Sequence, residues 1–160
     1  MAQRHNSFGP VKGPIVGSYL PMAASQYFRF NSGAFGYLDS SGHFTGNITA
    51  TQNIWGWALT PKSVAASSAL AYWTSSSTAA ADELFIIHSI STVFAMPTLD
   101  STYAAARVGE LCDLIAVNDG TGQTANVGTN TQDILRIVGG DITLDIVHVC
   151  MNDNELQKDT

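Results

Sequence analysis

Short runs of β-branched and aromatic residues, separated by clusters of Gly, Pro, Asn, Asp and Ser, recur along most of the chain. The pattern predicts strands over residues 27–30, 34–38, 51–59, 84–88, 92–96, 111–117, 134–138 and 142–149. Segments 84–88 and 92–96 are either two strands or one strand bent at residues 89–91. Because the intervening turns are short, the pattern favours an all-β fold, a small antiparallel β-barrel or sandwich with at most one or two short helices.

Two further segments carry specific expectations. Gly139 and Gly140 separate two β-branched runs and predict the two-residue turn of a hairpin. Residues 101–108 contain three consecutive alanines behind a candidate N-cap at Ser101, and they predict a short helix that ends before Gly109. Residues 64–74 fit a short helix or an irregular strand equally well.

Residues 1–25 are predicted to be an extended N-terminal arm, because Gly9-Pro10, Gly13-Pro14 and Pro21 fix φ and remove amide donors. The arm is also rich in apolar residues: Phe8, Val11, Ile15, Val16, Tyr19 and Leu20. A solvated linker needs no such residues, so we expect the arm to lie on a surface, either that of its own domain or that of a neighbouring subunit. Residues 26–151 would then be the β domain, and residues 152–160 a polar tail.

Composition narrows the function further. Of the 160 residues 45% are hydrophobic and only 12% are charged, and the net charge is −6 from seven Lys+Arg against 13 Asp+Glu. So few cations argue against a nucleic-acid-binding face, and so few charges argue against a helical bundle. No apolar run is long enough for a membrane span, and the first residues lack the apolar core of a secretory signal. We therefore expect synthesis in a cytoplasm and a weakly charged surface that is covered by partners.

Few residues suggest chemistry. Cys112 and His148 are a conceivable nucleophile and base, with Asp113 or Asp145 to orient the imidazole, but no local sequence context supports a cysteine hydrolase. His148 and Cys150 would share a strand face and offer two ligands to a metal, while the remaining histidines lie in unrelated segments. The sequence therefore predicts no catalytic residue, no metal and no cofactor, and it predicts two free thiols.

Trp55 and Trp57 are predicted to lie on the same face of one strand, with Gly56 marking a bulge or a close backbone approach. Together with Tyr72 and Trp73 they would suit a sugar-stacking platform. The same pair would equally suit a barrel core or a subunit interface.

Five segments resemble small structural proteins encoded among the head genes of tailed phages, some of which are capsid cement or decoration proteins. The segments are GHFTGN (42–47), IWGWA (54–58), ADELFII (81–87), VGELCDLI (108–115) and DILRIVGGD (133–141). The resemblance implies a small β-barrel or sandwich with an extended arm, which binds as a trimer at three-fold positions of an icosahedral shell.

The leading hypothesis is therefore a non-enzymatic virion structural protein, a capsid cement protein that stabilises the head shell as a homotrimer. Its partners would be the major capsid protein and its own copies, without nucleic acid or membrane, and it would lie on the capsid surface. The predicted capsid or subunit contacts are Phe8, Val11, Ile15, Tyr19, Leu20, Trp55 and Trp57. The alternatives are a carbohydrate-binding or lectin-like module and a tail or baseplate subunit.

Overall fold

The computed structural model describes residues 8–29, 33–46, 48, 54–60, 72–98, 103–115 and 123–152. This part of the chain is all-β, as the sequence predicts, apart from the 3-10 turn η1 at Ala105–Arg107. The strands are β1 (Gly9–Lys12), β2 (Gly17–Pro21), β3 (Tyr27–Arg29), β4 (Ala34–Leu38), β5 (Phe44–Thr45), β6 (Gly56–Leu59), β7 (Tyr72–Thr74), β8 (Glu83–Ile87), β9 (Val93–Pro97), β10 (Leu111–Ile115), β11 (Thr124–Asn126), β12 (Leu135–Asp141) and β13 (Ile146–Met151). The described residues include no helix long and apolar enough to cross a membrane.

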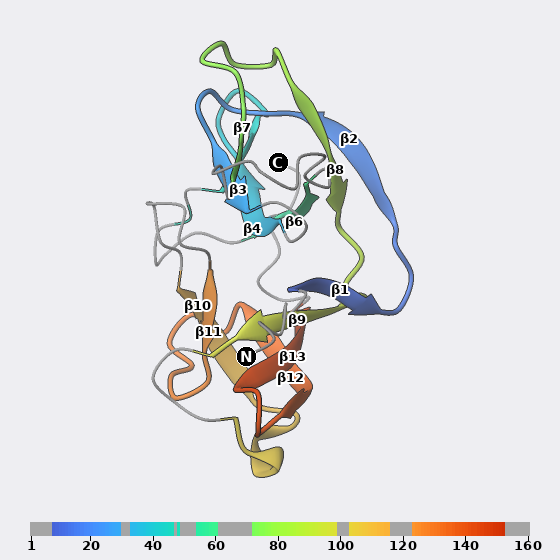
Figure 1. Ribbon diagram of the computed structural model, residues 1–160, viewed down its shortest axis with the longest axis vertical. Helices are drawn as coiled ribbons and strands as arrows, with labels where there is room; N and C mark the ends of the chain where they lie inside the picture. The colour runs from blue at the N-terminus through green and yellow to red at the C-terminus, as the bar shows by residue number, and fades with distance from the viewer. Residues whose placement is uncertain are drawn as a thin grey trace, which may run out of the picture.

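The strands form two large antiparallel sheets, which stack along the long axis of the molecule (Figure 1). One sheet has six strands in the order β1-β9-β13-β12-β10-β11, and the other has five in the order β2-β8-β6-β4-β5. A separate two-stranded ribbon pairs β3 with β7. Of the two architectures that the sequence allowed, the sandwich-like one is present, and neither sheet closes into a barrel.

The larger hydrophobic core lies where side chains of the two sheets meet. Phe94 of the six-stranded sheet contacts Phe35 and Trp57 of the five-stranded sheet, at ring-centroid distances of 5.0 and 5.2 Å. Phe35 and Trp57 meet edge to face at 4.7 Å. Aromatic rings in these geometries attract one another beyond the area that they bury, so this trio couples the two sheets.

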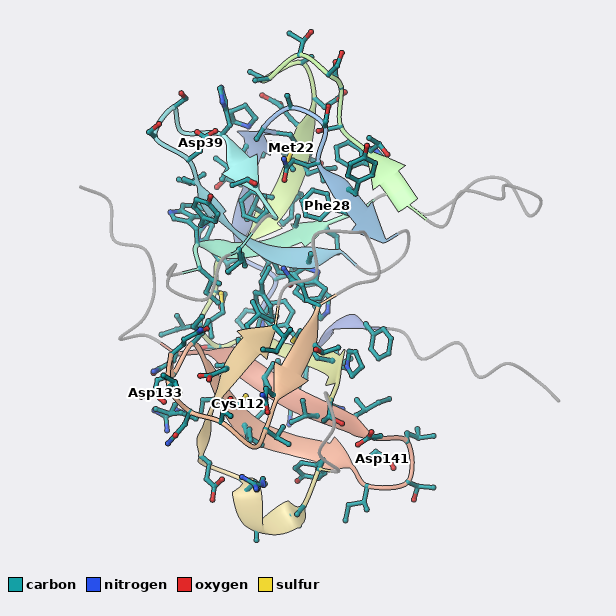
Figure 2. The ribbon with its side chains drawn as sticks, turned by 90° about the vertical axis from the view of Figure 1, so that its left-hand side faces the viewer. Met22, Phe28, Asp39, Cys112, Asp133 and Asp141 are labelled. Atoms are coloured by element: carbon teal, nitrogen blue, oxygen red, sulfur yellow. The ribbon has the colours of Figure 1, made fainter. Side chains whose placement is uncertain are left out.

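A second, smaller core lies on the other side of the five-stranded sheet. Side chains alternate across a strand, so Trp57 joins the first core while its neighbour Ala58 joins the second. Met22, Phe28 and Phe44 fill this second core, and Figure 2 shows Met22 and Phe28 enclosed in the upper part of the molecule. The sheet is therefore buried on both faces, which explains the nearly continuous apolar sequence of β8.

The predicted turn at Gly139-Gly140 is wrong, because both glycines lie inside β12. The turn is at residues 142–145, where the Asp141 carboxylate accepts hydrogen bonds from the N–H groups of Thr143 and Leu144. Gly140 is required for packing: a Cβ there would lie 2.7 Å from the ring of Tyr103 and 2.6 Å from the carbonyl oxygen of Ile146. Gly140 therefore admits a buried aromatic ring to the strand surface.

The predicted helix over residues 101–108 is also wrong where the structure describes it. Ala104 has an extended backbone, and only the single turn η1 follows. Tyr103 is buried in the larger core, over Gly140. Burial of this ring overrides the modest helical preference of the alanines that follow it. Ser101, the predicted N-cap, lies outside the described residues, as do residues 64–71.

Candidate interaction surface

The N-terminal arm supplies one edge strand to each of the two large sheets. β1 pairs antiparallel with β9, with Gly9 opposite Ala95, and β2 pairs antiparallel with β8, with Tyr19 opposite Phe85. The blue arm therefore runs along one margin of the molecule and joins the two sheets (Figure 1). Of the two surfaces that the sequence left open for the arm, residues 9–21 lie on that of their own domain.

A sharp bend between β1 and β2 is held against the turn that joins β8 to β9. Gly13 has a φ of +94°, and a Cβ there would lie 2.3 Å from the carbonyl oxygen of Ser91. The hydroxyl of Thr92 donates a hydrogen bond to the carbonyl of Pro14. The bend is therefore packed closely against Ser91 and Thr92, and its side chains project from this packed segment.

Exposed apolar side chains gather at this bend. Val11, Ile15 and Val16 are 49%, 59% and 52% exposed, and Ile90, in the facing turn, is 42% exposed. We call these four residues the bend patch. Several exposed aliphatic side chains on one packed bend and its facing turn are typical of an interaction surface.

The remaining predicted contact residues divide between surface and core. Tyr19 is 67% exposed and extends the apolar margin along β2. Phe8 is half-buried, and Leu20 is half-buried against the second core. Sequence reasoning did not select Ile90, although a lone isoleucine between two serines in a turn is a recognisable signal.

The tryptophan platform does not form. Trp57 is only 2% exposed and belongs to the larger core, whereas Trp55 packs against the second core and meets His88 edge to face at 5.0 Å. The prediction that the two side chains share a face is wrong, because β6 begins only at Gly56 and Trp55 precedes the regular strand. Trp57 therefore serves the core, whereas the predicted close approach at Gly56 is confirmed: a Cβ there would lie 2.5 Å from the carbonyl oxygen of Ile87.

Comparison of the chain with protein-family models, curated proteins and solved structures finds no match. Function is therefore inferred from the surface and from the chemistry of the described side chains.

Cys112 and His148 do not meet. Cys112 is opposite Leu135, which is opposite Met151, so these three side chains share the inner face of the six-stranded sheet. His148 is three residues before Met151 on β13 and therefore lies on the outer face. Both cysteines are free, and the described residues hold no group of three or more His, Cys, Asp or Glu side chains suited to a metal ion.

Cys112 is expected to resist alkylation in the native protein. Its side chain is fully buried, and burial, with smaller contributions from Asp113 and Cys150, raises the pKa of the thiol to about 12. Roughly one thiol in 10⁵ is then ionised at pH 7, and only the thiolate is nucleophilic. Mass spectrometry after iodoacetamide treatment should show the label at the half-buried Cys150 first and at Cys112 only on unfolding. Rapid labelling of Cys112 in the folded protein would contradict this assignment.

A polar cavity of about 560 Å³ lies between the turn after η1 and residues 127–133. It is lined by both ends of an Arg107–Glu110 ion pair, 3.2 Å apart, and by Arg136, which donates a hydrogen bond of 3.2 Å to the carbonyl of Gly109. The arginines are thus already engaged within the protein, and the cavity carries no excess charge that would select a ligand.

One wall of this cavity is held by the buried carboxylate of Asp113. It accepts hydrogen bonds from the Thr129 hydroxyl at 2.8 Å and from the N–H groups of Thr131, Gln132 and Asp133 at 3.1, 2.7 and 3.3 Å. Burial alone would raise the pKa of Asp113, but these hydrogen bonds outweigh it and hold the pKa below its ordinary value. Asp113 is therefore a structural anchor for residues 129–133.

Proposed function

We propose that this chain is a non-enzymatic virion structural protein, a capsid cement or decoration protein that binds and stabilises an icosahedral head shell. The observation that carries the proposal is the bend patch, four exposed aliphatic residues at the bend that joins the two sheets and in the turn that faces it. The major capsid protein is the proposed partner at this patch. The trimeric state that the resemblance implies remains a prediction.

Three properties support a role in assembly. The bend patch presents aliphatic side chains at a low desolvation cost, since Lys12 is the only charged residue between positions 8 and 21. The two sheets share the larger core, so attachment through the arm holds the whole domain and not one sheet alone. A shell also repeats each contact many times, so a small patch suffices for stable attachment.

A lysine in the bend patch is expected to weaken attachment to the shell. Ile15→Lys or Val16→Lys would place a charge in an apolar contact, with an expected loss of tenfold or more in affinity, about 1.4 kcal/mol. The measurement is the occupancy of purified particles stripped of the protein, as a function of added protein, by cosedimentation and electron microscopy. Point substitutions are preferable to deletion of the arm, because deletion removes an edge strand from each sheet.

The matched control is Ile142→Lys, at an isoleucine that is 57% exposed in the turn between β12 and β13. It should bind shells as the unmodified protein does. Equal occupancy for all three variants would refute the role of the bend patch, and an unmodified protein that binds no shell would refute the proposed function.

A further inference from the structure

Among the described residues, strand β2 has an open outer edge, and the bend patch does not include this edge. It is the terminal strand of the five-stranded sheet, and no described strand pairs with its outer side. The carbonyl of Val16 accepts a hydrogen bond from the N–H of His88, and the N–H of Met22 donates to the carbonyl of Asp82. In an antiparallel pair the direction of the backbone groups alternates, so Gly17, Tyr19 and Pro21 direct theirs away from β8.

The other edges of the two large sheets are shorter or protected. β5 has two residues and β11 has three. β1 carries Lys12, lacks an amide hydrogen at Pro10, and has a register shift between these two residues. Charges, prolines and bulges are the devices by which proteins block pairing at a sheet edge. β2, with five residues, has none of them before Pro21, so it is the edge best suited to accept another strand.

The side chains on β2 favour a second copy of this chain as the partner. Tyr19 packs edge to face on Phe85, with ring centroids 5.4 Å apart, and Phe85 is opposite Leu59 on β6. Leu59, Phe85 and Tyr19 thus form an apolar row that ends at the open edge, where Tyr19 is 67% exposed. An antiparallel copy of β2 centred on Tyr19 would continue the row with its own Tyr19, and aromatic cross-strand pairs stabilise a sheet.

Charge supports the same partner. The chain carries a net charge of −6, so two copies repel over most approaches. β2 contains no charged residue, and the nearest charge on the arm is the cation of Lys12. Antiparallel pairing of two β2 strands therefore places no like charges directly opposite each other, and the nearest acidic residue is Glu83, opposite Pro21 on β8.

We propose that the β2 edges of two copies pair antiparallel across a two-fold axis at Tyr19, joining their five-stranded sheets into one continuous sheet. The inference rests on the proposed function, because it is the icosahedral shell that supplies the two-fold axes. These axes lie between the three-fold positions, where neighbouring subunits would meet. Pairing of five-residue strands covers only a few hundred Å² per copy, less than the roughly 800 Å² per partner of a standard specific interface. The contact is therefore weak in solution, and attachment of both copies to one shell strengthens it.

The test is the mass of the full-length protein in solution, measured by sedimentation equilibrium between about 10 µM and 1 mM, the range in which a small contact associates. The mass should rise at least twofold across this range for the unmodified protein and for Tyr19→Phe. It should stay constant for Tyr19→Lys, which places two like charges opposite each other. The matched control is Tyr27→Lys, at a tyrosine that is 58% exposed on β3, and it should associate as the unmodified protein does.

A second measurement is independent of how well Tyr19→Lys folds. Tyr19→Cys treated with a short bismaleimide should give a peptide linked between positions 19 of two copies, and Tyr27→Cys should give no corresponding link. A mass that does not rise, a rise that Tyr19→Lys leaves intact, or the absence of the 19–19 link would overturn the inference. Association without attachment to shells would instead refute the proposed function alone, and attachment without association would refute the two-fold contact alone.

Discussion

Replacement of Phe94 by alanine is expected to destabilise the protein by about 3–5 kcal/mol, a large part of the stability of a domain of this size. Phe94 is fully buried and contacts Phe35 and Trp57 of the opposite sheet. The substitution removes the ring that links the sheets and leaves a cavity between them. Strand pairing within each sheet limits how far the backbone can move to close this cavity. Surrounding side chains are thus poorly placed to fill it.

Chemical denaturation followed by tryptophan fluorescence measures this loss, since Trp57 stacks on Phe94 and reports on its environment. Phe94→Leu, which keeps most of the apolar volume, should cost less. The exposed control Ile142→Ala should change the free energy of unfolding by about 0.5 kcal/mol or less. A loss below about 1 kcal/mol for Phe94→Ala would show that the aromatic trio does not hold the sheets together.

Replacement of Asp113 by asparagine is expected to cost about 3 kcal/mol near neutral pH. The carboxylate receives four hydrogen bonds from residues 129–133, and an amide offers one acceptor oxygen in place of two. Buried N–H groups would then lose their partners while the amide hydrogens meet other donors. Residues 129–133 should therefore detach from β10 before the rest of the domain unfolds.

The Asp113 carboxylate should also make the free energy of unfolding depend on pH. Because hydrogen bonding holds the pKa of Asp113 in the folded protein below its ordinary value of 3.8, the folded state favours the ionised form. The stability that this provides is fully present above about pH 4 and is lost as the pH falls through the lower, folded-state pKa. The free energy of unfolding should therefore fall more steeply below pH 4 in the unmodified protein than in Asp113→Asn.

Denaturant titrations at a series of pH values measure both effects. The matched control is Asp141→Asn, since the Asp141 carboxylate also accepts two backbone N–H groups but lies at the exposed end of β12, next to the turn before β13 (Figure 2). Asp141→Asn should lower the free energy of unfolding by less than about 1 kcal/mol, because water replaces the missing hydrogen-bond partners. Parallel pH curves for the unmodified protein and Asp113→Asn would contradict the anchoring role of Asp113.

The sequence by itself determined the all-β class and the positions of several strands. Residues 34–38 form a short apolar run between Gly33 and Asp39, and β4 has these bounds. The sequence also located the two runs on either side of residues 89–91, although only the structure shows that they are separate strands in different sheets. The prolines of the N-terminal arm predicted its extended backbone. Each of these features depends on local backbone preference and on short-range patterning, which the sequence displays directly.

Tertiary structure decided which surfaces the same residues face. Gly139 and Gly140 have the composition of a turn, yet they lie within a strand because the ring of Tyr103 occupies the space beside Gly140. Trp55 and Trp57 have the spacing of one face, yet they belong to different cores because the strand begins between them. The arm lies on its own domain because β8 and β9 are there to pair with it, leaving Val11, Ile15, Val16 and Tyr19 exposed. These outcomes depend on contacts between residues far apart in the chain, and local periodicity contains no information on which distant strand fills a space.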